Sequence, residues 1–341
     1  MLNSAEAVVV GRALAQLSTF LPSQFTTNAS VLNHDRYTQD SLDHRVGPAR
    51  PESGTALPKN STPKVPLREP TLSHPFQADA SAPLTQGLRV FASARRTETI
   101  ADLADLGIET VSLEVDKPER VRELRREIEE LTGGKLDILV NNAGRNYTVP
   151  ALDVDFDEVR ETFEVNVFSV MRMCQEFAPL LIEAKGTIVQ IGSLAGVMPY
   201  VFGGVYNASK AALHQYSNTL RVELSPFGVR VVTIVTGGIK SNIARTDRQL
   251  PEDSYYIPLS QEYQRRLKHS QEGAMPSEDY AKSVVSKVLR SSPPKWVWEG
   301  NKAWVVWFLY NYLPKGLMDA VFFRMFNLWK LIGTTRAKKT E

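Results

Sequence analysis

The 341-residue sequence has 40 Lys and Arg residues against 38 Asp and Glu, and 43% of its residues are hydrophobic. These proportions are ordinary for a globular protein. They exclude wholesale disorder, and the small net charge gives no reason to expect nucleic-acid binding. Cys174 is the single cysteine, which excludes a disulfide framework and a multi-cysteine zinc site, so we expect no bound metal. One free thiol suits a reducing compartment such as the cytoplasm.

The first 83 residues differ in composition from the rest of the chain. They hold 9 of the 20 prolines, with many Ser, Thr and Asn residues between them. Such a stretch buries too little apolar surface to offset the entropy of ordering, so we expect residues 23–83 to be largely disordered. We therefore predict an N-terminal extension over residues 1–83, in which residues 6–20 alone have the apolar character of folded structure.

Short apolar runs alternate with helical patterns from Gly87 onward. The runs have the length of buried strands, and Gly107 stands where the C-terminal cap of a helix would lie. This alternation predicts right-handed βαβ units and hence an α/β fold, a Rossmann-type doubly wound parallel sheet over residues 84–290. We expect strands at 88–93, 110–115, 136–140, 186–191 and 229–235, and helices at 97–106, 118–131, within 156–183 and at 205–224.

The C-terminal part, residues 291–341, is apolar and aromatic. All five tryptophans lie between Trp296 and Trp329. No apolar run reaches the roughly 18–20 residues that span a bilayer. Tryptophan and tyrosine favour the membrane–water boundary. Two interpretations therefore stay open for residues 296–332: a lid that closes a substrate pocket, or short helices that contact a membrane surface.

Three separated motifs carry the chemistry. Asn141-Asn142-Ala143-Gly144 ends one predicted strand, Ser193 follows another, and Tyr206 and Lys210 share one face of a predicted helix. In this order and at these positions they resemble the signature of the short-chain dehydrogenase/reductase family. The resemblance covers residues 87–245 closely. It implies a Rossmann-type fold and hydride transfer between a nicotinamide cofactor and a ketone or alcohol.

The resemblance also implies catalytic roles for four side chains. Tyr206 donates a proton to the carbonyl, Ser193 holds that carbonyl by a hydrogen bond, and Lys210 contacts the nicotinamide ribose. A tyrosine titrates near ~10, and a nearby ammonium favours the phenolate, so we expect Lys210 to lower the pKa of Tyr206. Asn166 matches the helix asparagine that positions a water in the proton relay. Taken singly, each residue has an ordinary alternative: Tyr206 as a packed aromatic residue, Lys210 as a solvated charge, Ser193 as a loop residue and Asn166 as a helix cap.

Cofactor-binding residues are expected at the carboxyl ends of the predicted strands. Arg95 and Arg96 follow one such strand, and no Asp or Glu lies between Gly87 and Arg96. Arginine accommodates a ribose 2′-phosphate, which favours NADP(H), while two solvated arginines are the alternative. The other cofactor-binding residues that the resemblance implies are Glu114, Asn141, Ala143, Gly144, Tyr206, Lys210, Gly238, Ile239 and Ser241.

One element of the family pattern is missing. Its members begin with a strand and a Thr-Gly-x-x-x-Gly-x-Gly loop whose amides approach the cofactor pyrophosphate, and this sequence has no such motif. Residues 6–10 are either a remnant of the central first strand, with Gly11 as the last glycine of a deleted loop, or part of an amphipathic helix. Because the missing amides would weaken cofactor binding, a catalytically silent protein is the alternative to an enzyme.

The aromatic tail, the arginine pair and the turn at 236–243 resemble most the NADPH-dependent 1-acyldihydroxyacetone-phosphate reductase branch of the family. This resemblance implies a lipid ketone as substrate and lipid metabolism on the cytoplasmic side of the endoplasmic reticulum or at a lipid droplet. A polyketide or other secondary-metabolite carbonyl is the alternative. We expect a hydrophobic ketone or alcohol as partner, no nucleic acid, and a homo-oligomer formed through the long helices around 156–183 and 205–224.

Overall fold

The computed structural model describes residues 5–10, 88–241, 243 and 247–334, with only the backbone described for 5–10. These residues form a seven-stranded sheet of order β3-β2-β1-β4-β5-β6-β7, in which every neighbouring pair is parallel. The α/β doubly wound fold is therefore confirmed. The strands are β1 (Ala5–Val10), β2 (Leu88–Ala94), β3 (Glu109–Ser112), β4 (Ile138–Asn141), β5 (Thr187–Ile191), β6 (Arg230–Thr236) and β7 (Trp296–Glu299).

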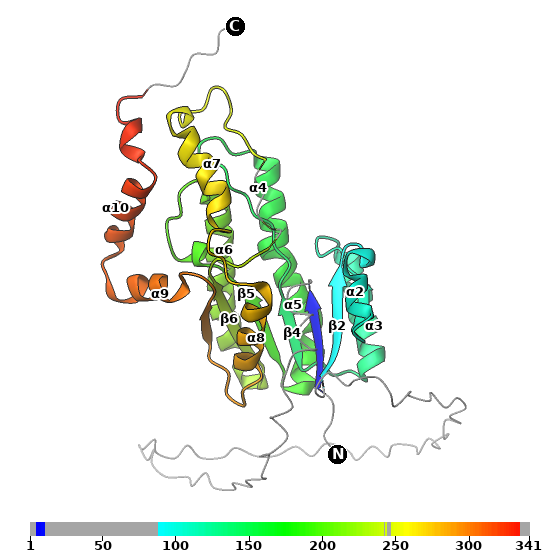
Figure 1. Cartoon of the computed structure of the whole chain (residues 1–341). Coiled ribbons are helices and arrows are strands. Elements are labelled where there is room, and N and C mark those ends of the chain that lie inside the picture. The colour runs from blue at the N-terminus through cyan, green and yellow to red at the C-terminus, as the bar shows by residue number, and fades with distance from the viewer. Residues whose placement is uncertain (1–4, 11–87, 242, 244–246, 335–341) are drawn as a thin grey trace, which may run out of the picture. The chain divides into compact units, whose positions relative to one another are not determined.

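The N-terminal strand β1 occupies the centre of the sheet, between β2 and β4 (Figure 1). Ala7 pairs with Val90 on one side and with Ile138 on the other, both in parallel register. Residues 6–10 are thus the first strand of the fold and not part of a helix. Gly11 and the expected disorder at 23–83 lie outside the described residues.

Helices cover both faces of the sheet. On one face, apolar side chains of α3, α5 and α6 pack against β2, β4 and β5. On the other face, α2 and α8 supply the apolar side chains. A π-helical turn at Glu164–Phe168 joins α4 to α5. The helices before β7 are α2 (Ala101–Ala104), α3 (Pro118–Thr132), α4 (Phe156–Phe163), α5 (Ser169–Ala184), α6 (Gly204–Leu224), α7 (Ser260–His269) and α8 (Ser277–Val288), and two further helices follow β7.

Two boundaries differ from the sequence-based expectation. The helix expected at 97–106 is a 3₁₀ turn, Thr97–Ile100, followed by the single helical turn α2. The sheet also continues past residue 290, because β7 pairs with β6 from Thr233 to Thr236. The predicted domain boundary at 290 is therefore wrong, since it separates β7 from the sheet. The composition of β7, Trp296-Val297-Trp298-Glu299, is similar to that of the aromatic tail that follows this strand.

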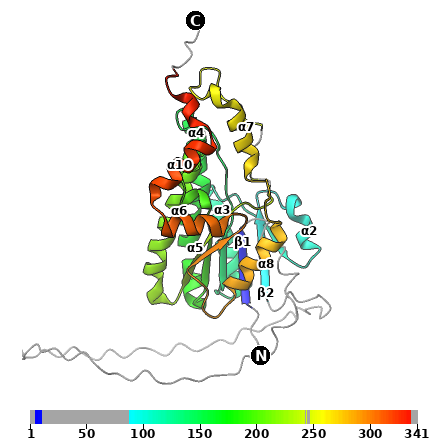
Figure 2. The same ribbon diagram turned by 60° about the vertical axis from the view of Figure 1, so that its left-hand side comes forward.

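The C-terminal segment forms α9 (Ala303–Tyr312), α10 (Lys315–Met325) and a 3₁₀ turn, Leu328–Leu331. One side of it is packed: Ala303, Val306 and Met318 join Leu194 and Val235 in a small core. Its other side leaves many large apolar side chains exposed. In the part of the chain that the structure describes, none of the helices is long and apolar enough to cross a membrane. Figure 2 shows α9 and α10 in orange and red beside α6.

Substituting proline for Val9 tests the position of β1. Val9 pairs with Ala92 and with Val140, and proline cannot donate a hydrogen bond to either neighbour. We expect the free energy of unfolding to fall by about 2 kcal/mol or more, because the lost bond leaves a carbonyl unpaired in the sheet. Urea denaturation measures the change, and Val9→Ile, which keeps the N–H, is the control. Equal stability of Val9→Pro and the wild-type chain would show that β1 is not part of the sheet.

Candidate active site

The signature residues meet at the carboxyl ends of β4, β5 and β6. Ser193 follows β5 and caps a 3₁₀ turn at Leu194–Gly196, where its hydroxyl accepts a hydrogen bond from the Ala195 N–H at 3.2 Å. Tyr206 and Lys210 lie in the first turns of α6, one helical turn apart. The Ser193 hydroxyl lies close enough to the Tyr206 side chain to act on its pKa. Two hydroxyls that could contact a single carbonyl oxygen therefore stand side by side.

A buried histidine holds the Ser193 backbone in place. The Ser193 N–H donates to Nε2 of His214 at 3.2 Å. Burial, together with the charge of Lys210, lowers the pKa of His214 to about 4, so the ring is neutral and can accept this bond. A Cβ atom at Gly192 would lie 2.2 Å from His214 Nε2, which explains why glycine occupies that position. His214 is not among the residues predicted from the sequence, although it stands one helical turn after Lys210 on the same face.

Lys210 is a buried ammonium without a carboxylate partner among the described residues. Only 4% of it is exposed, and its Nζ donates to the Ile191 carbonyl at 2.9 Å. Burial lowers the pKa of Lys210 to about 8. Its Nζ lies 5.9 Å from the centre of the Tyr206 ring. The amine therefore sits beside the phenol with unused hydrogen-bonding capacity.

The pKa of Tyr206 is raised above its usual value, which corrects the expectation that Lys210 lowers it. Burial of the ring is the dominant cause, and it outweighs two opposing effects. These are the hydrogen bond from Ser193 and the charge of Arg266 on α7. The cation that favours the phenolate is thus Arg266, a residue that the sequence analysis did not select.

Asn166 connects the segment after β4 to α6. It lies in the π-helical turn, fully buried, and its Oδ1 accepts from the Arg145 N–H at 2.8 Å. Its Nδ2 donates to the Arg145 carbonyl and to Ser209 Oγ, each at 2.9 Å. The side chain therefore uses its hydrogen bonds to fix this corner, and the relay role implied by the resemblance stays a prediction.

Several residues at this edge of the sheet fit a nicotinamide cofactor. A Cβ atom at Gly144 would lie 3.7 Å from Lys210 Nζ and 3.6 Å from Asn166 Oδ1, so glycine keeps this approach open. The Ile239 N–H has no hydrogen-bond partner within the described ranges and could donate to a carboxamide. By contrast, Gly238 already uses its N–H on the Asn301 carbonyl and its carbonyl on Met275 and Asn301. Ser241 donates its N–H to Gln271 Oε1 at 3.2 Å, and its hydroxyl is exposed.

The other residues expected to bind the cofactor differ in how far their side chains are exposed. Arg95 and Arg96 are exposed and directly follow β2, next to the end of β1. Glu114 is exposed after β3, and Ala143 is half-buried. Asn141 is different, because its buried amide donates to Gln190 Oε1 at 3.1 Å and to Cys174 Sγ at 3.5 Å. Its side chain joins β4 to β5 and leaves only its backbone to face the edge.

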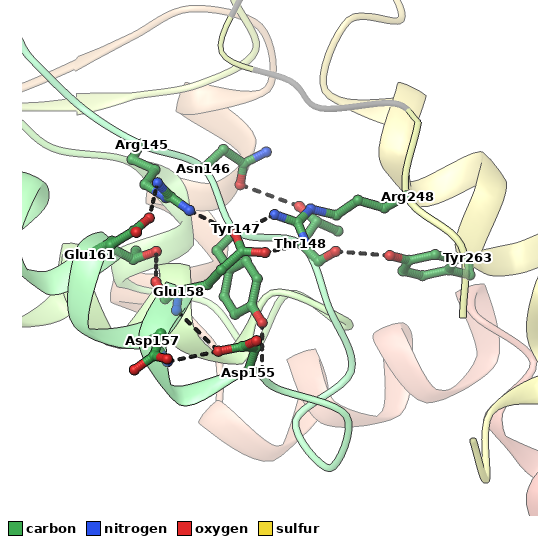
Figure 3. A network of polar contacts seen from close by, with 11 residues as sticks. Arg145, Asn146, Tyr147, Thr148, Asp155, Asp157, Glu158, Glu161, Arg248 and Tyr263 are labelled. Carbon is green, nitrogen blue, oxygen red and sulfur yellow. Dashed lines mark hydrogen bonds and ion pairs between the residues drawn. The ribbon is translucent and has the colours of Figure 1, made fainter. Parts of the chain in front are cut away.

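A carboxylate bridges two arginines beside the site (Figure 3). Glu158 on α4 accepts from Arg145 at 2.7 Å and from Arg248 at 2.5 Å and 3.1 Å. The hydrogen bonds from Arg248 are the main reason that the pKa of Glu158 is lowered. Arg248 also stacks on Tyr147, with its guanidinium carbon 4.8 Å from the ring centre. These ion pairs connect the segment after β6 to α4, and no spacing of residues in the sequence predicted them.

Comparisons with known proteins agree with this geometry. Residues 77–251 match the family model described as short chain dehydrogenase. The chain is 45% identical, over 73% of its length and 89% of the relative's, to short-chain dehydrogenase RED1 of Pyricularia oryzae. It is 40% identical to the NADPH-dependent 1-acyldihydroxyacetone phosphate reductase of Saccharomyces cerevisiae, over 74% of this chain and 88% of that protein.

The solved structures agree as well. A short-chain dehydrogenase from Streptomyces avermitilis matches with a TM-score of 0.58 at 26% identity, over 73% of this chain and 90% of that one. The chain therefore belongs to the short-chain dehydrogenase family, as its motifs indicated.

Replacing Lys210 by methionine tests whether burial of the Lys210 charge lowers the free energy of unfolding. Below pH 8, Lys210 is protonated in both the folded and the unfolded chain, so folding carries the full free-energy cost of burying its charge. Between about pH 8 and the ordinary value of 10.5, the folded chain loses the proton first, so wild-type stability rises with pH. We expect Lys210→Met to raise the free energy of unfolding at pH 7 by about 1 kcal/mol or more, and by less at pH 9.5. Urea denaturation at both pH values decides, and a Lys210→Met chain less stable than wild type at pH 7 would contradict this account.

Proposed function

We propose that this chain catalyses the NADPH-dependent reduction of a ketone to a secondary alcohol. The observation that carries the proposal is the buried amine of Lys210, 5.9 Å from the centre of the Tyr206 ring, with the Ser193 hydroxyl close to the same tyrosine. A carbonyl oxygen placed between the two hydroxyls would receive hydrogen bonds from both. This arrangement suits a reaction in which negative charge develops on that oxygen.

Each residue of the site would have a separate role in such a reaction. The cofactor, when bound, supplies the hydride to the carbonyl carbon. Tyr206 gives the proton of its hydroxyl to the carbonyl oxygen, while Ser193 holds that oxygen in place. Lys210, with its pKa lowered to about 8, can release and regain a proton near neutral pH and can restore the proton of Tyr206. Asn166 fixes the surrounding backbone through its three hydrogen bonds.

The preference for NADPH follows from charge at the end of β2. Arg95 and Arg96 are exposed there, where the fold places the adenosine ribose of a dinucleotide. The yeast relative is named as NADPH-dependent, which supports the same choice. Glu114, Ala143, Gly144, Ile239 and Ser241, with the backbone of Asn141 and Gly238, would line the rest of the cofactor.

For the substrate we propose a hydrophobic ketone such as an acyl-dihydroxyacetone phosphate. The support is the name of the yeast relative and the aromatic C-terminal segment, whose Phe326 packs with Phe202 near the start of α6. A secondary-metabolite carbonyl is the second candidate for the same chemistry.

Substituting phenylalanine for Tyr206 tests the proton donor. The change removes the hydroxyl and keeps the ring, so the fold should be preserved. We expect kcat for NADPH-dependent ketone reduction to fall about 10²–10⁴-fold, the usual contribution of a positioned acid. The measurement is NADPH oxidation at 340 nm, with Tyr216→Phe on the same helix as the control. Unchanged turnover in Tyr206→Phe would exclude the proposed acid, and absence of turnover in the wild-type chain would favour the silent protein.

We further propose that α9, α10 and the turn after them contact a membrane surface on its cytoplasmic side. Trp304 is 73% exposed and Trp329 is 54% exposed, and both belong to a segment with exposed basic residues at 315 and 324. Exposed tryptophans next to cations favour the headgroup region of an anionic bilayer. The homo-oligomer through the long helices α5 and α6 stays a prediction.

Binding to lipid vesicles tests this second proposal. We expect the double variant Trp304→Ala, Trp329→Ala to bind vesicles containing phosphatidylserine at least about tenfold more weakly than wild type, since each large apolar side chain is worth about 1.5–3 kcal/mol on burial. Sedimentation with vesicles measures the binding. Phe227→Ala, which removes an exposed ring outside this segment, is the control. Equal binding of the double variant and wild type would contradict the proposal.

A further inference from the structure

Arg266 on α7 is a buried cation that no carboxylate balances. It is 4% exposed, and within the described part of the chain it takes part in no ion pair. Its Nε donates to the Val201 carbonyl at 3.1 Å, which is its one hydrogen bond to a described residue. Its guanidinium carbon lies 3.6 Å from the centre of the Tyr200 ring. A guanidinium has five N–H donors, so four of them are left for another acceptor.

The free end of this guanidinium faces the start of α6. A Cβ atom at Gly203 would lie 3.3 Å from Arg266 Nη2. Gly203 is the N-cap residue of the 21-residue helix α6, and no side chain caps this helix. The N–H groups of its first turn, at Gly204, Val205 and Tyr206, thus remain available, since the first bond inside the helix runs from the Asn207 N–H to the Gly203 carbonyl. The start of a long helix and a guanidinium both attract an anion.

This corner adjoins the reacting groups. Tyr206 belongs to the same first turn of α6, and the charge of Arg266 acts on its hydroxyl. An anion held here would therefore lie at the same helix end as Tyr206, the proposed proton donor. On the other side of Arg266, Tyr200 lies 5.7 Å from Phe322 and 6.1 Å from Phe326, measured between ring centres. The polar corner is thus bordered by an apolar wall from α10.

Burying an unbalanced guanidinium costs free energy, and the aromatic ring and one carbonyl recover only part of it. A residue that served packing alone would be replaced at lower cost by an apolar side chain. A bound anion would supply both the missing charge and the missing acceptors, in bidentate geometry that suits arginine.

We propose that Arg266 and the N-terminus of α6 form a subsite for an anionic group, a phosphate or a carboxylate, that the ketone substrate carries near its carbonyl. The subsite rests on the proposed ketone reduction and adds the class of substrate, an anionic ketone with an apolar chain. The chain lies against Phe322 and Phe326, and the anion orients the carbonyl toward Tyr206.

The kinetic test compares ketones that differ only in charge. The substrates are a 1-acyl-dihydroxyacetone phosphate, the same ketone without phosphate, and a keto acid of similar length. We expect Arg266→Gln to lower kcat/KM about 100-fold for whichever anionic ketone the subsite accepts, and less than about threefold for the neutral ketone. Arg266→Lys, which keeps the charge, should recover part of the loss. Lys268→Gln, an equal loss of charge at an exposed residue of the same helix, should leave all three rates unchanged.

Other outcomes would overturn the subsite. An equal loss for neutral and anionic ketones would mean that Arg266 acts on Tyr206 or on the fold. No loss for any ketone would mean that the guanidinium meets no substrate.

A binding measurement separates failure of the subsite from failure of the proposed reduction. Calorimetric titration with 1-oleoylglycerol 3-phosphate and with 1-oleoylglycerol requires no turnover. Tighter binding of the phosphorylated compound to wild type, lost in Arg266→Gln and kept in Lys268→Gln, would uphold the subsite even in a chain that reduces nothing. Equal binding of the two compounds to wild type would overturn it, whether or not the ketones are reduced.

Discussion

The pairing of β1 with two parallel neighbours is the constraint on which the rest of the structure depends. The chain runs outward from β1 through β2 to β3, and outward on the other side from β4 to β7. Loops that follow neighbouring strands diverge at such a reversal, and the resulting crevice is where open α/β sheets bind ligands. Six residues, Ala5–Val10, create this reversal, because without them β2 and β4 would have no common neighbour. The reversal of strand order is therefore present although the family's glycine-rich loop is missing from the sequence.

Charge without counter-charge is the second feature of the site. Lys210 and Arg266 are both 4% exposed, and neither meets a carboxylate among the residues described. By contrast, Glu158 forms ion pairs with both Arg145 and Arg248. Burial places the charge of Lys210 beside Tyr206 in a region of low dielectric, where negative charge on an oxygen is stabilised more than in water. In the proposed reduction, Lys210 would act on the reacting oxygen, and Arg266 would hold the anionic group of the substrate.

Local pattern predicted most of the fold and the centre of the site. Strands such as 187–191 are wholly buried, so the apolar run alone marks them. Tyr206 and Lys210 could be paired because helical spacing places them on one face. β7 was not predicted from the sequence. Its four residues are of three different types and lie inside an aromatic stretch, so they show no distinct period of hydrophobicity.

Contacts between distant segments explain the other omissions. Arg248 meets Glu158 across 90 residues of sequence, and Arg266 meets Val201 across 65. No spacing rule connects such pairs, because the folded sheet alone brings them together. The inward amide of Asn141 is a related case, since its partner Gln190 lies on the next strand and could be recognised only from the strand register.

Titration of the wild-type chain with NADPH and NADH, followed by quenching of tryptophan fluorescence, tests the central claim most directly. If β1 and the exposed Arg95 and Arg96 complete a dinucleotide site, NADPH will bind in the micromolar range and more tightly than NADH, and an Arg95→Ala, Arg96→Ala variant will lose this difference. Absence of NADPH binding at millimolar concentration would show that the sheet edge built around β1 does not hold the cofactor.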